Sequence, residues 1–229
     1  MRMRLDRNAD AYLLTERELK VLLAGQNNDF VFGLLSDKAA ECSETKADVY
    51  TALADMVRME KISTDGESFR IAEPIASCVR QIGAAETVGL LSFCDEDYPT
   101  CCYVLDDVVT CRRVRYQPEI LRVKKYSKRE FNDVWLARFD DGLITGDVTE
   151  EALWAEAPAE YFSFSVYRSR ELTVRISVSA APLSSPEIVV LRRDGGDRSA
   201  FSKEALSNLI DYYFINGLSS GERSYADHG

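Results

Sequence analysis

The chain has 229 residues, of which 46% are hydrophobic, and its formal net charge at pH 7 is -10. This length and composition allow a large core in one domain or in two small packed domains, and the negative charge disfavours nucleic acid as a partner. No stretch approaches eighteen consecutive apolar residues and the start lacks the apolar region of a signal peptide, so the sequence predicts a soluble, cytoplasmic protein with no membrane segment.

The N-terminal region is expected to begin with helices. After about ten residues that are typical of a frayed lead, Thr15 and Glu18 have the spacing of a capping box, which predicts a helix that ends at Gly25. Apolar residues then recur at helical spacing between Lys46 and Glu60, which predicts a second helix.

A short hairpin and a third helix complete this region. Asp65-Gly66 lies between two short strand-like runs and is typical of a tight turn. Glu73-Pro74 then opens a helix for which Gly83 is the expected C-cap. Because helix, helix and hairpin follow one another as in a winged-helix domain, residues 1–86 are predicted to be a helical, winged-helix-like region.

A winged helix that binds DNA would place the helix Lys46–Glu60 in the major groove. The outward positions of this helix carry more acids than bases, and the hairpin tip Asp65-Gly66-Glu67 is also acidic. Since a recognition helix lies between two rows of phosphates, this charge opposes DNA binding. The winged shape is therefore expected to serve packing or protein contact.

From residue 87 the pattern changes to strands joined by short connections, which favour an antiparallel meander. Four strand-like runs and an amphipathic helix come first. After a break at Asp140-Asp141-Gly142 and a brief helix over Glu150–Ala155, four more runs and another helix follow. The expected strands are Val88–Phe93, Cys101–Leu105, Val109–Tyr116, Ile120–Tyr126, Tyr161–Tyr167, Leu172–Val178, Ile188–Arg193 and Arg198–Phe201, with turns at Gln117-Pro118 and Gly195-Gly196.

The two series of strands resemble each other. In each, a hairpin leads to a Ser-Lys pair that opens an amphipathic helix, first at Ser127 and again 75 positions later at Ser202. The apolar face of the first of these helices is formed by Phe131, Val134, Trp135 and Phe139. The sequence thus predicts an α+β protein with two pseudo-symmetric, antiparallel strand-meander-plus-helix halves over residues 87–140 and 141–216, and a disordered tail over 217–229.

No pattern of residues points to an enzyme. The six cysteines include no Cys-x-x-Cys pair, and the only histidine, His228, lies at the end of the chain, so the commonest general base is missing. Cys101 and Cys102 are adjacent on an expected strand and therefore point to opposite faces. The cysteines are interpreted as buried free thiols in a reducing compartment.

Two further motifs are weighed against simpler interpretations. Gly217–Gly221 has the spacing of a nucleophile elbow, but that elbow needs a strand before it and a helix after it, whereas here a helix precedes and a polar tail follows. The acids Asp95-Glu96-Asp97 could offer oxygen ligands to a divalent cation, but three acids in a strand turn are more often solvated. We expect no catalytic residue, no cofactor and no metal site.

One hairpin carries an unusual concentration of basic residues. Alternation places Arg113 and Arg115 on one face of its first strand, and Arg122 and Lys124 on one face of its second, while the register between the two pairs stays open. The cluster is either a charged strand edge that discourages aggregation or a docking patch for an acidic protein partner. These four residues are the candidate partner-binding residues.

Two stretches and the order of the elements resemble a known family. The stretches are Leu14-Thr15-x-x-Glu18-Leu19 and Ala52–Ile62 before the hairpin. Over about residues 12–214 the chain resembles the EspG-type chaperones of type VII (ESX) secretion. The resemblance implies a quasi-two-fold α/β fold and a cytosolic chaperone that keeps helical-hairpin secretion substrates soluble, and it carries over no binding residue.

The sequence therefore favours a non-enzymatic cytoplasmic adaptor or chaperone that binds a protein partner, such as a helical-hairpin secretion substrate. The alternative is a winged-helix transcriptional regulator with a C-terminal sensing or dimerisation domain. Neighbouring genes for helical-hairpin proteins would favour the first function, and salt-sensitive binding to duplex DNA would favour the second.

Overall fold

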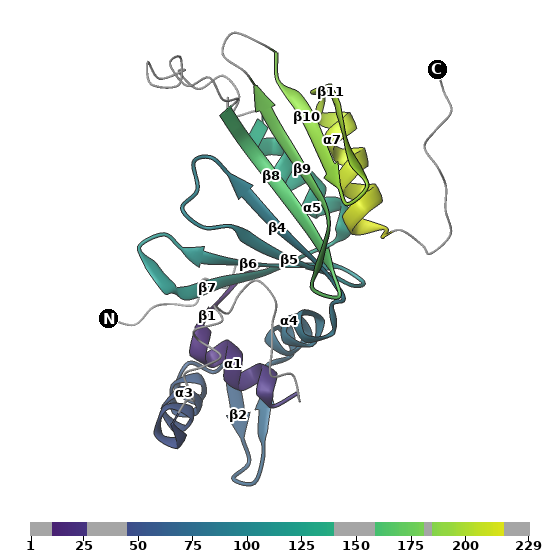
Figure 1. Cartoon of the computed structure of the whole chain (residues 1–229). Helices are drawn as coiled ribbons and strands as arrows, with labels where there is room; N and C mark the ends of the chain where they lie inside the picture. The colour runs from purple at the N-terminus through teal and green to yellow at the C-terminus, as the bar shows by residue number, and fades with distance from the viewer. Residues whose placement is uncertain (1–10, 27–44, 140–158, 181–184, 218–229) are drawn as a thin grey trace.

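The computed structural model describes residues 11–26, 45–139, 159–180 and 185–217. Their central feature is a nine-stranded sheet with the order β1-β7-β6-β5-β4-β8-β9-β10-β11 (Figure 1). Every neighbouring pair of strands in it is antiparallel. Helices accompany this sheet on both faces, so the predicted α+β class is confirmed at this level.

Two consecutive meanders build most of the sheet and meet at its centre. There β4 pairs with β8, from Thr87 opposite Arg168 to Phe93 opposite Phe162. Each meander extends outward from this pair, and all eight strands predicted from the sequence are present with slightly shifted ends. The strands are β4 (Thr87–Phe93), β5 (Thr100–Val104), β6 (Val108–Val114), β7 (Gln117–Tyr126), β8 (Ala159–Arg168), β9 (Glu171–Ala180), β10 (Glu187–Arg192) and β11 (Gly195–Ala200).

Two helices that begin at serine N-caps cover one face of the sheet. They are α5 (Lys128–Leu136), extended by the 3-10 turn η1 (Ala137–Phe139), and α7 (Lys203–Ile210), extended by the π-helical turn η2 (Asp211–Ile215). The Ser127 hydroxyl accepts a hydrogen bond from the Glu130 N–H, and the Ser202 hydroxyl accepts one from the Ala205 N–H. Both predicted helix starts are therefore confirmed.

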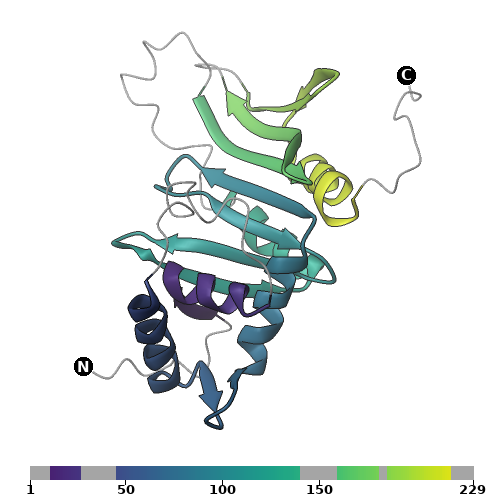
Figure 2. The same cartoon turned by 60° about the horizontal axis from the view of Figure 1, so that its bottom comes forward.

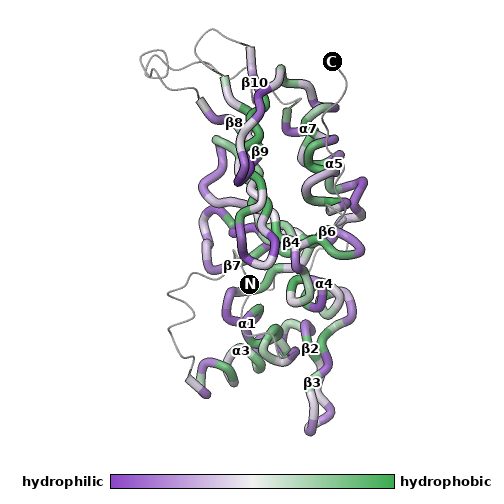
Figure 3. Tube along the Cα trace, turned by 45° about the vertical axis from the view of Figure 1, so that its right-hand side comes forward, coloured by the Kyte–Doolittle hydropathy of each residue, from purple (hydrophilic) through white to green (hydrophobic). Residues whose placement is uncertain are grey.

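Aromatic side chains fill the space between these helices and the strands. Trp135 of α5 stacks on Phe162 of β8 with ring centroids 5.4 Å apart. Phe214 of η2 meets Phe164 of β8 edge to face at 5.0 Å. Hydrophobic positions gather on the facing sides of the strands, α5 and α7 (Figure 3). Burial of these large side chains, together with the aliphatic residues of the same core, stabilises this face.

The other face of the sheet is covered by the N-terminal helices, but only over the first meander. Leu19 of α1 and Val79 of α4 belong to one core with Val109, Leu121 and Val123 of β6 and β7. Figure 2 shows α1 lying along these strands, with α3 and α4 to either side. The elements are α1 (Glu16–Ala24), α3 (Lys46–Arg58), the hairpin β2 (Ile62–Thr64) and β3 (Phe69–Ile71), and α4 (Glu73–Ala84).

A buried ion pair joins α1 to the end of α3. Glu18 closes the predicted capping box by accepting a hydrogen bond from the Thr15 N–H at 2.7 Å. Its carboxylate also pairs with the Lys61 ammonium at 2.7 and 2.8 Å, and the two side chains are only 6% and 14% exposed. Glu18 thus caps α1 and also holds Lys61, just after the end of α3, against α1.

The first described strand, β1 (Ala11–Thr15), was not predicted from the sequence, which gave no element between the frayed lead and the helix cap at Thr15. It pairs with β7 from Ala11 opposite Lys124 to Thr15 opposite Ile120. Of its five residues only Leu14 is fully buried, and Leu13 is exposed. A run of five residues has too little alternation of polar and apolar side chains to reveal a strand. Its partner strand lies more than a hundred residues away in the chain, so no local hairpin signal reveals it either.

Both predicted turns of the outer hairpins are wrong by about two residues. The chain turns at Arg115-Tyr116 and at Arg193-Asp194, ahead of the Gln117-Pro118 and Gly195-Gly196 pairs. Gly196 lies in β11, where an added Cβ would stand 2.9 Å from the Leu191 side chain and 3.1 Å from the Val190 carbonyl oxygen. Glycine is used here for close strand packing, and the turn is made before it.

Two further expectations need correction. Gly83 lies inside α4, which runs on to Ala84 and has Ala85 as its C-cap. Val134 was placed on the buried face of its helix, but 52% of it is exposed. The predicted helix over Glu150–Ala155, the frayed lead, residues 218–221 of the elbow motif and most of the tail lie outside the described residues. Among the residues that are described, no helix is long and apolar enough to cross a membrane.

Candidate functional site

The register of the β6–β7 hairpin decides where its basic residues lie. Arg112 stands opposite Arg122 and Thr110 stands opposite Lys124, so these four side chains share one face of the sheet, the face that carries α5. Arg113 stands opposite Leu121, which belongs to the core on the other face. The hairpin therefore divides its cations between the two faces.

Two of the four predicted partner-binding residues are held in internal ion pairs. Arg113 pairs with Glu16 of α1 and donates a hydrogen bond to the Pro118 carbonyl at 2.6 Å. Arg115 lies in the turn and its Nε is 2.9 Å from an Asp97 oxygen. The prediction that Arg113 and Arg115 share a strand face is wrong, because β6 ends before Arg115 and the register shifts between Arg113 and Val114.

The other two predicted residues, Arg122 and Lys124, lie together beside α5. They line a depression of about 200 Å³ between α5 and the strands of the first meander. We call it the basic groove. Its cations are Arg112, Arg122, Lys124 and Arg138, and its apolar wall includes Phe131, Val134 and Trp135.

A buried carboxylate orders one side of the basic groove. Glu96 is only 4% exposed, and its Oε1 atom accepts from Arg112 at 3.0 Å and from Arg138 at 2.8 Å. Its Oε2 atom is buried and accepts no hydrogen bond from any residue that the structure describes. The Arg138 guanidinium also pairs with Asp95 at 2.7 Å and lies over the Phe93 ring. These contacts fix two of the four cations.

The acids considered as metal ligands are thus the partners of arginines. Asp95, Glu96 and Asp97 contact Arg138, Arg112 and Arg115 rather than one another. Over the described ranges no group of three or more histidine, cysteine or acidic side chains is arranged to hold a metal ion.

Arg122 and Lys124 differ from Arg112 and Arg138 because neither forms an ion pair with a described carboxylate, although hydrogen bonds from Ser127 and the charge of Lys124 together lower the pKa of Glu130. Arg122 is exposed. The Lys124 ammonium lies 4.6 Å from the centre of the Tyr126 ring, a cation–π contact that leaves its hydrogen-bond donors available. Two adjacent cations of the basic groove can therefore receive an anionic ligand.

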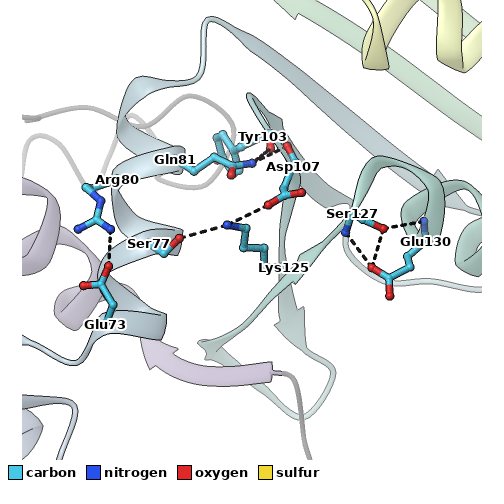
Figure 4. Close-up of polar contacts among 9 residues, drawn as sticks. All are labelled: Glu73, Ser77, Arg80, Gln81, Tyr103, Asp107, Lys125, Ser127 and Glu130. Atoms are coloured by element: carbon cyan, nitrogen blue, oxygen red, sulfur yellow. Dashed lines mark hydrogen bonds and ion pairs between the residues drawn. The ribbon is translucent and has the colours of Figure 1, made fainter.

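A second depression, of about 500 Å³, lies between α4 and α5 and shares Lys124, Tyr126 and Val134 with the basic groove. We call it the α4–α5 hollow. In it the Lys125 ammonium contacts the Ser77 hydroxyl at 3.2 Å and the Asp107 carboxylate at 2.9 Å (Figure 4). The shared lining residues place the two depressions side by side.

Polar contacts hold α4 and the start of α5 at the borders of the α4–α5 hollow. The Gln81 amide donates to the carbonyl oxygens of Tyr103 and Asp107 at 2.9 and 2.6 Å, which fastens α4 to the β5–β6 turn (Figure 4). At the start of α5, the Glu130 carboxylate accepts from the Ser127 hydroxyl and N–H. These hydrogen bonds, the one from the hydroxyl first, lower the pKa of Glu130.

The buried thiols of the two cores are poorly suited to nucleophilic chemistry. Burial raises the pKa of Cys101 to about 12 and raises the pKa values of Cys102 and Cys111 as well, so all three stay protonated at neutral pH. Cys101 belongs to the core under α1 and α4 and Cys102 to the core under α5 and α7, so their predicted opposite orientation is confirmed. Cys94 is exposed, and burial of part of its side chain raises its pKa also.

Arg122 and Lys124 were predicted from the sequence, but Glu96, Arg112 and Arg138 were not predicted to belong to the site. Arg112 precedes Arg113 in the same hairpin, and strand alternation alone could have assigned the two to opposite faces. Arg138 follows Val134 by four positions and so falls on the same side of the helical turn, which was a usable signal. Glu96 could not be found in this way, because its role depends on the packing of a turn against a distant helix.

A comparison with known protein families and a search of curated proteins find no match to this chain. The resemblance to the EspG-type chaperones therefore stays a prediction, and the function is argued from the site.

Proposed function

We propose that this protein is a non-enzymatic cytoplasmic adaptor or chaperone that binds a partner protein, as its resemblance to the EspG-type chaperones of type VII secretion suggests. The proposal rests on the basic groove. There Arg122 and Lys124, which have no ion-pair partner among the described side chains, stand beside an apolar wall on a protein of net charge -10. A positive patch on an acidic protein steers association with an acidic partner surface.

A quasi-two-fold fold is part of this proposal. The order β4, β5, β6, β7, α5 recurs as β8, β9, β10, β11, α7, and both series start at the antiparallel β4–β8 pair. A two-fold axis perpendicular to the sheet would relate two meanders in this way. The proposal requires Val109–Phe139 to superpose on Ile188–Phe214 as the same unit.

The two halves differ in how their second face is covered, and this difference also favours a binding role. The helices α1, α3 and α4 pack on the first half (Figure 2). On the corresponding face of the second half, Ser163, Ser165, Val189 and Leu191 are covered by no helix that the structure describes. A helical-hairpin substrate could occupy such a face, which would supply the helices that this half lacks.

The alternative, a winged-helix regulator, is favoured by one observation: α3 is followed directly by the β2–β3 hairpin. The charges on this surface oppose it. Arg17 and Arg58 already pair with the acids Asp48 and Asp55 of α3. Hydrogen bonds from Ser68 and Glu67 lower the pKa of Asp65 at the hairpin tip, so the tip keeps its negative charge near DNA.

Affinity purification from the native host, followed by mass spectrometry, tests the proposed function. We expect the wild-type chain to retain a protein partner and the Arg122→Glu/Lys124→Glu variant to lose it. Exposed charges contribute only about 0–1 kcal/mol each to stability, so this variant should remain folded. Salt-sensitive retention of duplex DNA without any protein partner would reverse the ranking in favour of the regulator.

A further inference from the structure

Two arginines face each other across the basic groove. Arg112 of β6 and Arg122 of β7 are direct partners in the antiparallel register. Like charges directly opposite each other on a sheet are destabilising, since their Cβ atoms are only about 5 Å apart. Glu96 neutralises Arg112, but Arg122 has no carboxylate partner among the side chains that the structure describes. An anion bound beside Arg122 would neutralise the second of these two facing charges.

The spacing of the groove residues follows that of an extended chain. Arg122, Lys124 and Tyr126 are alternate residues of β7 and point to one face of the sheet. Alternate residues of a strand are about 6.6 Å apart, and alternate side chains of an extended peptide have the same separation. A peptide lying along β7 could therefore place two acids against Arg122 and Lys124 and an apolar side chain against Tyr126.

The size of the groove also favours a peptide. Its volume of about 200 Å³ lies below the roughly 300–1,000 Å³ that is usual for small-molecule and cofactor sites, and it accommodates individual side chains. Because the groove shares Lys124, Tyr126 and Val134 with the α4–α5 hollow, a longer ligand can continue beyond it.

From this geometry we propose that the basic groove binds an extended acidic segment of the partner protein, with carboxylates at two alternate positions and an apolar residue two positions beyond. This inference rests on the proposed function, because it names the chemistry of the partner at the same site. The carboxylates pair with Arg122 and Lys124, and the apolar side chain packs beside Tyr126 and Val134.

Two synthetic peptides of identical composition test the spacing. The matching probe is acetyl-Gly-Glu-Ser-Glu-Ser-Leu-Gly-amide, and the control is acetyl-Gly-Glu-Glu-Ser-Ser-Leu-Gly-amide, whose adjacent acids point in opposite directions when extended. Each is titrated to millimolar concentration into the ¹⁵N-labelled full chain. The β7 amides and the indole N–H of Trp135, a residue whose side chain lines the groove, report binding. We expect the matching probe to bind about fivefold more tightly, the factor that one additional exposed ion pair supplies.

Matched variants assign the site. Arg122→Gln/Lys124→Gln should weaken the matching probe at least about tenfold, since both pairs are lost. The control variant Arg80→Gln/Arg115→Gln removes the same charge from two arginines outside the groove and should bind the probe like the wild type. The inference is overturned if neither probe binds or if both bind equally tightly. It is also overturned if the two double variants lose the same amount of affinity for the matching probe. Displacement of the probe by an equal concentration of inorganic phosphate would overturn it as well, because it would identify a simple anion site.

The two proposals fail separately. If affinity purification recovers a protein partner that Arg122→Gln/Lys124→Gln retains as well as the wild type does, the groove inference is wrong, and the adaptor function stands only with a binding surface outside the basic groove. If no protein partner is recovered, the adaptor function is wrong, whatever the peptides do.

Discussion

Gly89, in the middle of the central strand β4, is the position where the fold should tolerate a methyl group least. A Cβ added there would lie 2.4 and 2.5 Å from the Cζ and Cε2 atoms of Phe164, and 3.1 Å from the Phe214 ring. Both rings are buried and pack edge to face against each other. Since neither can move into solvent, Gly89→Ala must displace aromatic rings of the core beneath α5 and α7.

Overpacking of this kind typically costs about 1–3 kcal/mol of unfolding free energy. For a chain of this length each kcal/mol corresponds to about 2–4 °C, so a cost of about 2 kcal/mol lowers the thermal midpoint by about 4–8 °C. Urea denaturation followed by circular dichroism and a calorimetric scan measure the two quantities. Gly25→Ala is the matched control, because Gly25 has helical backbone angles and the nearest atoms to an added Cβ are 3.5 Å away.

A double-mutant cycle separates the steric effect from a general loss of strand stability. Phe164→Leu removes the two ring atoms that an alanine at position 89 would strike, at a cost of its own of about 1 kcal/mol or more. In the Phe164→Leu background, Gly89→Ala should cost at least about 1 kcal/mol less than in the wild type. The steric explanation would be refuted if the free-energy costs of the two substitutions were additive, or if Gly89→Ala were as stable as the wild type.

Three further predictions test other parts of the structure. Lys61→Met leaves the buried Glu18 carboxylate without its cation and should lower the unfolding free energy by about 3 kcal/mol, measured by urea denaturation. Cys94 should react with iodoacetamide in the native protein, while Cys101, buried and with its pKa raised to about 12, should react only after unfolding, as peptide mass spectrometry can show. Glu130 has a lowered pKa, so its stabilisation of the α5 cap is fully present above the ordinary value of 4.5 and is lost as pH falls through the lowered value. The Ser127 amide resonance should therefore shift only below about pH 4.5, and Glu130→Gln should abolish that titration.

The parts of the fold that were predicted correctly depend on local chemistry. The capping residues Thr15 and Ser127 each act within one helical turn, so the sequence shows both partners of the cap at fixed spacing. Strand alternation and short connections likewise revealed the two meanders. These signals need no knowledge of what packs against the element, and they therefore identified the strands β4 to β11 and the helices α5 and α7.

The errors arose where long-range pairing decides the outcome. The strand β1 exists because β7 offers it a partner, and nothing inside Ala11–Thr15 reveals that partner. The Gly195-Gly196 pair was taken for a turn because glycine favours turns, but Gly196 is needed where β11 passes close to Leu191. Propensity alone cannot distinguish a glycine that turns from one that permits close packing.

The same limit explains why only half of the candidate site was predicted. Alternation shows that Arg122 and Lys124 share a face, but a one-residue change in register would move both to the face that α1 covers. The ion pairs of Arg113 with Glu16 and Arg115 with Asp97 are formed between segments that are distant in the sequence. A basic cluster read from the sequence is therefore a list of available cations. Which of them form internal ion pairs is decided only by the folded chain, and of the four predicted residues Arg113 and Arg115 do so, while Arg122 and Lys124 form none with a residue that the structure describes.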